Sequence, residues 1–317
     1  MSSRSIALCK SETMSVRYKI EHLTTYEYPS PVLESFGHMR VLPRDLPGQK
    51  LLSHKVYCEP AASLSAFSDY FGNTVHAFSV PQKHEHLKLL SKCEVEVSTP
   101  VVPAVVKEVT VAEARQILHS RHLEHYDFFQ STQLVPVEMA FLPYVKRFFK
   151  PATEIFDAIL QLNEYIHTRF QYRMGKTGVE TTATEVARTK RGVCQDFAHF
   201  MLGVLRMAAI PARYVSGYIE TNQARSAVAE GHPNLVGAAA THAWVEALLP
   251  GDYWVGLDPT NNILAGDRHI IIARGRDYSD VAPARGIYRG SRATKLDVSV
   301  RVCRVADVSA NKKGKQP

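Results

Sequence analysis

The sequence has few cysteines and no pattern that pairs them. Its five cysteines are an odd number, are widely scattered and include no Cys-x-x-Cys pair: Cys9, Cys58, Cys93, Cys194 and Cys303. Disulfide-rich secreted domains use an even, closely spaced set, and zinc sites use paired ligands. The sequence therefore predicts neither a disulfide framework nor a zinc site. It favours a reducing compartment in which the thiols stay free.

Long hydrophobic runs are also missing. The apolar part of residues 1–13 is limited to Ile6-Ala7-Leu8, which is too short for the hydrophobic region of a signal peptide. No later stretch reaches the roughly 20 apolar residues that a membrane helix needs. We therefore expect a cytoplasmic protein with no membrane partner.

Clustered basic charge is scarce as well. The formal net charge of +7 comes from 38 basic and 31 acidic residues, and part of it lies in the terminal stretch Lys312-Lys313-Gly314-Lys315. No basic stripe is interleaved with aromatic residues, which is the pattern of nucleic-acid-binding surfaces. The charge therefore indicates solubility and predicts no nucleic-acid partner.

The composition is that of a globular chain with two domains. Its 317 residues are 45% hydrophobic and 22% charged, which is enough for sizeable cores. Short alternating runs, such as Val16-Tyr18-Ile20, predict an antiparallel β-sandwich or small barrel over residues 14–106. We expect an α+β catalytic core over residues 107–306. A disordered extension (1–13) and a disordered tail (307–317) flank the two domains.

Histidine clusters in two places suggest a metal site as an alternative. His84 and His86 lie two apart on a predicted strand, and His119, His122 and His125 lie three apart on a predicted helix. Nothing nearby completes a usual ligand set, and the helical series drifts around its helix. We interpret both groups as solvated faces and predict no metal and no cofactor.

The stretch RGVCQDFAHF, residues 191–200, carries the clearest functional signal. From Cys194 onward, Phe197, Met201 and Val204 recur at steps of three and four, as on a helix with one buried face. Cys194 therefore lies at a helix N-terminus, where free backbone N–H groups and the helix dipole favour a thiolate and stabilise an oxyanion. A lone cysteine is more often an inert core residue, so catalytic partners are required.

Two downstream runs supply such partners. THAWVEALL and YWVGLDPT flank a Pro250-Gly251-Asp252 turn, which predicts a β-hairpin. With the turn centred near Pro250, residues whose numbers sum to about 500 face each other, as His242 and Asp258 do. Such a pair lies on one face, where a carboxylate holds an imidazole in one tautomer. Together with Cys194 they provide a nucleophile, a base and an orienting acid.

The stretches RGVCQDFAHFMLGVLRMAAIPARYVSGYI, THAWVEALLP and YWVGLDPTNN together resemble the three core motifs of the transglutaminase-like superfamily, whose fold is related to papain-type cysteine proteases. The resemblance covers residues 155–290 directly. The preceding segment resembles the β-rich N-terminal region of bacterial transglutaminase-like proteins. The resemblance implies Cys194 as nucleophile, His242 as general base and Asp258 as its orienting acid.

Further residues are weaker candidates for lining the substrate site. Tyr172 follows the helix that would pack beside the Cys194 helix, and Trp244 shares a strand face with His242. The resemblance places Asp277 and Tyr278 near the cleft. For Tyr172 and Trp244, ordinary core packing is the alternative. Asp196, in the first turn of the Cys194 helix, is predicted to bond backbone amides and to take no part in the chemistry.

These motifs predict a reaction type and leave its outcome open. The Cys194 thiolate would attack a carboxamide of a peptide or protein, and the resulting thioester would be resolved by water or by an amine acceptor. Water makes the protein a protease or amidase, and an amine makes it a transglutaminase. The alternative from another class is a non-catalytic scaffold or binding module on the same fold. The sequence does not predict an oligomeric state.

Overall fold

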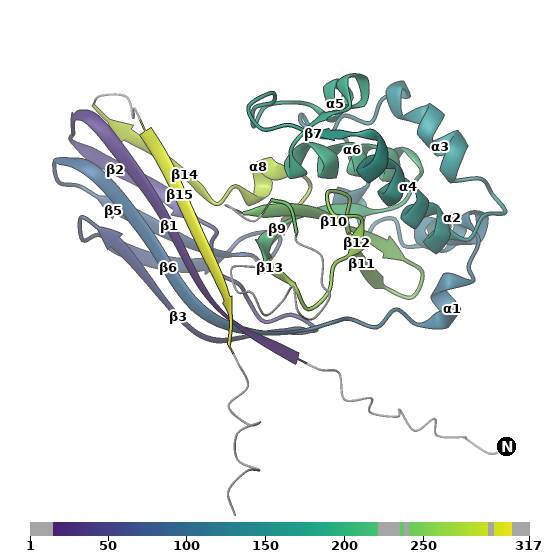
Figure 1. Cartoon of the computed structure of the whole chain (residues 1–317), viewed down its shortest axis with the longest axis horizontal. Coiled ribbons are helices and arrows are strands. Elements are labelled where there is room, and N and C mark those ends of the chain that lie inside the picture. Colours follow the sequence, from purple (N-terminus) through teal and green to yellow (C-terminus); the bar gives the residue numbers. More distant parts are fainter. Residues whose placement is uncertain (1–14, 221–234, 238–240, 291–294, 306–317) are drawn as a thin grey trace, which may run out of the picture.

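The computed structural model describes residues 15–220, 235–237, 241–290 and 295–305. It consists of a β-sandwich and a mixed α/β core that lie side by side (Figure 1). The predicted extension over residues 1–13 and the predicted tail over residues 307–317 lie outside the described residues.

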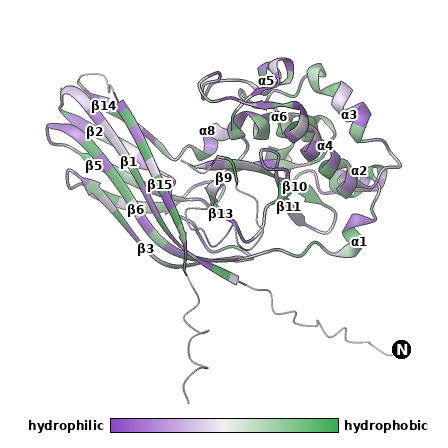
Figure 2. Ribbon diagram, viewed as in Figure 1, coloured by the Kyte–Doolittle hydropathy of each residue, from purple (hydrophilic) through white to green (hydrophobic). Residues whose placement is uncertain are grey.

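Two antiparallel sheets of four strands each form the sandwich. The first has the order β15-β1-β6-β3 and the second the order β14-β2-β5-β4. Their bounds are β1 (Ser15–Val32), β2 (Glu34–Met39), β3 (Gln49–Glu59), β4 (Ser63–Ser68), β5 (Thr74–Val80), β6 (His84–Ser98), β14 (Ala284–Arg289) and β15 (Lys295–Arg304). Residues alternate between buried and exposed along β1, starting from buried Val16, Tyr18 and Ile20. This period of two places one face of the sheet on a core. Figure 2 shows hydrophilic and hydrophobic residues in turn along the strands of the sandwich.

The two C-terminal strands correct the predicted domain boundary. The sequence assigned residues 107–306 to the catalytic core, but β15 pairs with β1 and β14 pairs with β2. The chain therefore returns to the sandwich after building the core. Strands this far apart in sequence pair only through the tertiary fold, so local patterns gave no signal for the pairing.

The core contains a five-stranded antiparallel sheet in the order β12-β11-β10-β9-β13. Its strands are β9 (Ala212–Ile219), β10 (His242–Leu249), β11 (Tyr253–Asp258), β12 (Ile263–Leu264) and β13 (His269–Gly275). Among the described residues, the α-helices are α1 (Ala104–Lys107), α2 (Val111–Ser120), α3 (Leu142–Phe148), α4 (Ile155–Arg169), α5 (Ala183–Thr189), α6 (Cys194–Met207) and α8 (Tyr278–Val281). Short elements complete the core: the 3₁₀ turns η1 (Tyr126–Phe128) and η2 (Met139–Phe141), and the parallel pair β7 (Gln171–Tyr172) and β8 (Arg191–Gly192).

Helix α6 lies at the centre of the core and packs on β9 and β10. Every residue of α6 from Phe197 to Arg206 is buried. The eight residues of β10 are buried too, among them Glu246. Burial alone would raise the pKa of Glu246, but contacts of 2.6 Å with Arg213 and 2.7 Å with Arg274 hold it below its usual value. The sheet that carries the site is thus fixed by apolar packing and by a satisfied buried charge.

Two side chains of the sandwich form hydrogen bonds with the backbone of β13 in the core. Gln49 bonds the backbone N–H and C=O of Ile271 at 2.7 and 2.8 Å. Asn73 bonds the backbone N–H and C=O of Arg274, both at 2.8 Å. These side-chain amides supply the donor and acceptor that a neighbouring strand would supply. Within the described ranges, no helix is long and apolar enough to cross a membrane.

Candidate active site

Cys194 is the first residue of α6 and is 9% exposed. The carboxylate of Asp196 accepts hydrogen bonds from the backbone N–H of Val193 and from the hydroxyl of Thr177, both at 2.7 Å. Burial raises the pKa of Asp196. The structure confirms that Asp196 bonds a backbone amide at the helix start. Cys194 sits where the free N–H groups of the helix converge.

Gly192 leaves room for this carboxylate. A Cβ atom on residue 192 would lie 2.3 Å from Oδ2 and 2.6 Å from Cβ of Asp196. We therefore expect Gly192→Ala to push Asp196 away from the Val193 amide and to lower the free energy of unfolding by about 1–3 kcal/mol. Urea unfolding measures this difference. Gly178→Ala is the matched control, because no heavy atom lies within 4 Å of its Cβ position. Equal stability of the two variants would contradict the expectation.

His242 and Asp258 form a fully buried hydrogen bond. The ring Nε2 of His242 lies 2.8 Å from Oδ2 of Asp258, and neither side chain is exposed. Burial alone would lower the pKa of His242, but Asp258 and Cys194 raise it to about 10. Burial alone would raise the pKa of Asp258, but His242 and His269 hold it well below its usual value. The pair therefore carries its charges at neutral pH as imidazolium and carboxylate.

The hairpin register differs from the predicted one by two residues. Val245 pairs with Leu257 and Leu249 pairs with Tyr253, so facing residues sum to 502 and not to 500. His242 and Asp258 are thus offset along the hairpin and do not face each other directly. A shift of two residues keeps both side chains on the same face, whereas a shift of one would have separated them.

The second ring nitrogen of His242 is the one available to the thiol. Nε2 is engaged by Asp258, which leaves Nδ1 as the ring nitrogen for the Cys194 side chain. Cys194 is close enough to raise the pKa of the ring. Gly237 also borders Nδ1, since a Cβ atom on residue 237 would lie 2.5 Å from it. The imidazole therefore has the Asp258 carboxylate on Nε2 and the Cys194 side chain close to its ring.

Two residues that sequence reasoning missed also contact the Asp258 carboxylate. Nε2 of His269 lies 3.2 Å from Oδ2, and the Nδ2 group of Asn261 donates to Oδ2 at 2.7 Å. Asn261 is part of the TNN segment that follows the motif, but no local pattern distinguishes it from an ordinary turn residue. His269 comes from β13 and Asp258 from β11, and strands β9 and β10 lie between these two in the sheet.

The predicted lining residues Trp244 and Tyr172 both lie near the residues predicted to be catalytic. The Trp244 ring is fully buried and stacks near the His242 ring, with centroids 6.2 Å apart and planes at 29°. Tyr172 packs edge-on against Phe197, and burial, followed by Cys194, raises its pKa to about 12. Trp244 therefore shields the imidazole as a core residue. Contact of either residue with substrate stays a prediction.

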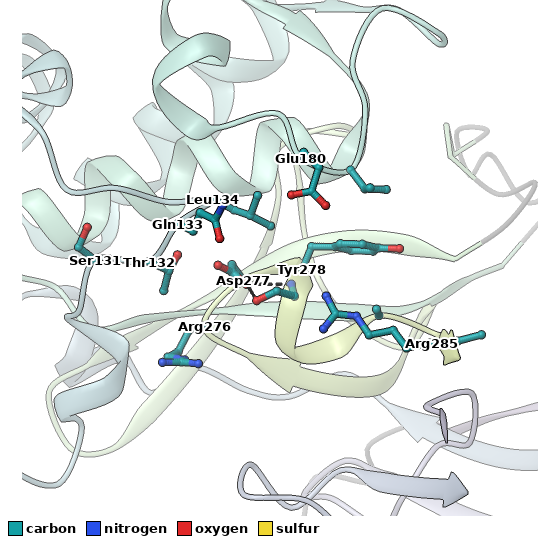
Figure 3. Close-up of a pocket in the computed structure, with 13 residues that line it drawn as sticks. Ser131, Thr132, Gln133, Leu134, Glu180, Arg276, Asp277, Tyr278 and Arg285 are labelled. Carbon is teal, nitrogen blue, oxygen red and sulfur yellow. Dashed lines mark hydrogen bonds between the residues drawn. The ribbon is translucent and has the colours of Figure 1, made fainter. Parts of the chain in front are cut away.

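Asp277 and Tyr278 line a cavity of about 670 Å³ (Figure 3). The cavity lies beside α6, because the backbone N–H of Tyr278 donates to Nε2 of His199 at 3.2 Å. Asp277 is 2% exposed and caps α8, accepting from the Ser279 amide at 2.8 Å. The walls come from several segments: Ser131–Leu134, Val179, Glu180, Arg276–Ser279, Ala282, Ala284 and Arg285. A role for Asp277 and Tyr278 toward substrate stays a prediction.

Histidines of the two clusters contact aromatic rings or form a hydrogen bond within the sandwich. His122 stacks on Phe129, with centroids 4.8 Å apart, and His125 lies edge-on to Trp254. His84 is buried and bonds Ser35 at 2.9 Å, so its interpretation as a solvated residue was wrong. Among the described residues, no group of three or more His, Cys, Asp or Glu side chains is placed to hold a metal ion.

Comparison with known proteins finds a family match for each of the two parts of the chain. The bacterial transglutaminase-like N-terminal region matches residues 18–96, and the transglutaminase-like superfamily core matches residues 143–259. An uncharacterized protein of Mycobacterium tuberculosis is 35% identical over 295 residues, which cover 90% of this chain and 92% of that protein. The protein-glutamine gamma-glutamyltransferase of Pseudomonas aeruginosa is 36% identical over 106 residues, which are 32% of this chain and 15% of that protein.

A solved structure shares the fold over nearly the whole chain. It is a proposed cysteine protease from Cytophaga hutchinsonii, with a TM-score of 0.72 and 22% sequence identity. The likeness covers 92% of this chain and 91% of that one. It confirms the predicted architecture, a papain-like core joined to an antiparallel β-rich region. With its full-length mycobacterial relative and its two matching family regions, the chain belongs to the transglutaminase-like superfamily.

Proposed function

We propose that this protein catalyses acyl transfer from a carboxamide of a peptide or protein, with Cys194 as nucleophile, His242 as acid and base, and Asp258 as its orienting group. The observation that carries the proposal is the buried bond of 2.8 Å between Nε2 of His242 and Asp258. This bond fixes the tautomer and leaves Nδ1 for a thiol at a helix start. The raised pKa of His242, about 10, supports an imidazolium beside the sulfur at neutral pH, and such a positive charge favours the thiolate.

In the proposed first half-reaction, the Cys194 thiolate attacks the carboxamide carbon and forms a C–S bond. The negative charge moves to the carbonyl oxygen, where free N–H groups at the start of α6 stabilise it. The tetrahedral intermediate then collapses, the C–N bond breaks, and the imidazolium of His242 gives its proton to the departing amine. The product is a thioester on Cys194 and a neutral imidazole.

In the second half-reaction, His242 takes a proton from the incoming nucleophile, which attacks the thioester carbon. The C–S bond breaks and the thiolate returns. Water gives hydrolysis and an amine gives transfer. The name of the Pseudomonas aeruginosa relative supports transfer, whereas that of the Cytophaga hutchinsonii protein, similar in fold, supports hydrolysis. Both outcomes share the first half-reaction and the same three side chains.

We further propose that the cavity lined by Asp277 and Tyr278 receives the peptide or protein that provides the carboxamide. Its position beside α6 supports this assignment. We keep the reducing cytoplasm as the proposed location, because it would leave the Cys194 thiol free.

Mass spectrometry of a peptide library incubated with and without monodansylcadaverine tests the proposal. Addition of the amine to glutamine-containing peptides would assign transfer, and cleaved or deamidated peptides would assign hydrolysis. Either product must depend on wild-type protein and vanish with Cys194→Ser. A scaffold would give neither product, and its Cys194 would be alkylated by iodoacetamide no faster than its other cysteines.

A further inference from the structure

The Asp258 carboxylate is contacted by more donors than one catalytic histidine provides. Oδ2 accepts from His242 at 2.8 Å, from His269 at 3.2 Å and from the Asn261 side chain at 2.7 Å. Oδ1 accepts from the backbone amides of Thr260 at 3.0 Å and Asn261 at 3.1 Å. Five donors therefore share a group with about four lone-pair sites. Three of the five compete for the oxygen that bonds the catalytic imidazole.

His269 serves the site as a neutral donor and not as a second base. The backbone N–H of Gly266 donates to its Nδ1 at 3.4 Å, so the hydrogen of the ring lies on Nε2 and points at Asp258. Burial lowers the pKa of His269 and keeps the ring uncharged. Neither ring nitrogen of His269 is left for the thiol, whereas His242 keeps Nδ1 for Cys194, which raises the pKa of its ring. The two histidines on one carboxylate therefore have different functions.

Asn261 forms hydrogen bonds both with Oδ2 of Asp258 and with the backbone of Val236. Its side chain donates to Oδ2 of Asp258, lies 3.5 Å from Nε2 of His242, and bonds the backbone of Val236 at 2.7 and 3.2 Å. Val236 precedes Gly237, which borders the free nitrogen of the imidazole. Asn261 thus fixes both the carboxylate and the backbone beside Nδ1.

These contacts affect how strongly Asp258 holds the proton of His242. Each extra donor withdraws negative charge from Oδ2 and competes with the His242 hydrogen. A carboxylate with fewer donors would bind the imidazolium more tightly. That imidazolium would give up its proton less readily to a departing amine, which makes it a poorer acid.

We propose that His269 and Asn261 are positioning residues that act through Asp258, limiting its hold on the imidazolium so that His242 releases its proton during acylation. The proposal rests on the function proposed for Cys194 and His242. It adds two residues, from β13 and from the turn after β11, to the three of the triad.

The titratable groups around the imidazole come from several elements. Asp258 belongs to β11, Cys194 to α6 and His269 to β13, with Arg268 beside His269. Tyr172 of β7 is near enough to Cys194 and Asp258 for both to raise its pKa. In variants of His269 or the Asn261 side chain, the two backbone donors on Oδ1 remain. The carboxylate therefore keeps its orientation and loses one donor only.

The test is the pH dependence of Cys194 alkylation by iodoacetamide in the full-length protein, followed from pH 4 to 11 by mass spectrometry of the Cys194 peptide. This reaction needs no substrate. Its alkaline inflection reports the pH at which the imidazolium beside the thiolate loses its proton. We expect His269→Phe and Asn261→Ala each to move this inflection upward by about half a unit to one unit. We expect alkylation at pH 7 to stay within about twofold of wild type, since the His242 ring is charged there in every variant.

Two further variants separate this proposal from a purely structural role. His269→Gln keeps an N–H donor within reach of Oδ2 and is expected to restore the wild-type inflection. His84→Phe removes another buried histidine, bonded to Ser35 in the sandwich, and is expected to change stability without moving the inflection. If His269→Phe fails to fold, the contrast between Asn261→Ala and His269→Gln carries the test.

The inference is overturned if the inflection of His269→Phe and Asn261→Ala is unchanged or lower, or if His269→Gln shifts as far as His269→Phe. That result would leave the proposed function intact, provided that wild-type Cys194 is selectively alkylated. Failure of the proposed function has a different signature, in which wild-type Cys194 reacts no faster than the other cysteines.

Discussion

Cys194→Ala is expected to abolish turnover of a carboxamide substrate, with a loss of about four orders of magnitude or more, while the fold is kept. The thioester cannot form without the sulfur, and the remaining groups provide only binding and oxyanion contacts. The change in stability is expected to be small because the side chain lies at the start of α6 and loses a single atom. The measurement is a comparison of turnover rates, together with intact-mass detection of an acylated protein.

Cys93→Ala is the matched control for this loss. Cys93 is also buried, at 6% exposure, but it lies in β6 of the sandwich, where burial raises the pKa of its thiol to about 12. Its thiol is expected to stay protonated and its removal to leave turnover unchanged. Activity that survives in Cys194→Ala, or that disappears equally in Cys93→Ala, would show that Cys194 is not the nucleophile.

The second large effect is expected from Asp258→Asn, with a loss of turnover of about three to four orders of magnitude. An amide lacks the charge that stabilises the imidazolium, and its NH₂ group would face donors that now contact a carboxylate oxygen. Because Asp258 raises the pKa of His242 to about 10, its removal lowers that pKa, and the ion pair is lost at lower pH. The pH profile of turnover and the unfolding free energy measure the two consequences.

A drop in stability is expected alongside, of about 1–3 kcal/mol, from buried donors left without an acceptor. Glu246→Gln separates the two effects, since it neutralises another buried carboxylate that bonds Arg213 and Arg274. That variant is expected to lose stability without moving the alkaline limb of Cys194 alkylation. A profile for Asp258→Asn that matches wild type would contradict the role given to the carboxylate.

The grouping of Cys194, His242 and Asp258 was predictable because each of the three residues is marked by a local pattern. Steps of three and four placed Cys194 at a helix start, and the turn at Pro250 placed His242 and Asp258 on one face of a hairpin. The predicted pairing was two residues off, because Leu249 pairs with Tyr253. His242 and Asp258 still lie on the same face of the sheet, because a register shift by an even number of residues does not move a side chain to the other face.

The remaining contacts depend on tertiary structure that no local pattern encodes. His269 reaches Asp258 only because β13 lies in the same sheet, with β9 and β10 between it and β11. The return of β14 and β15 to the sandwich depends likewise on pairing with strands more than two hundred residues earlier in the chain. Sequence periodicity indicates which face of an element is buried but not which distant element covers it.

The central claim is that Cys194 and His242 form a thiolate–imidazolium pair. The most direct measurement is the rate of Cys194 alkylation by iodoacetamide at pH 6 in wild type and in His242→Ala, both checked for native fold by circular dichroism. With its pKa raised to about 10, the imidazolium is present at pH 6, and its positive charge next to the sulfur favours the thiolate form. We expect alkylation to be about 100-fold faster in wild type than in His242→Ala, because an unpaired thiol is almost fully protonated at that pH. Equal rates in the two proteins would contradict the account.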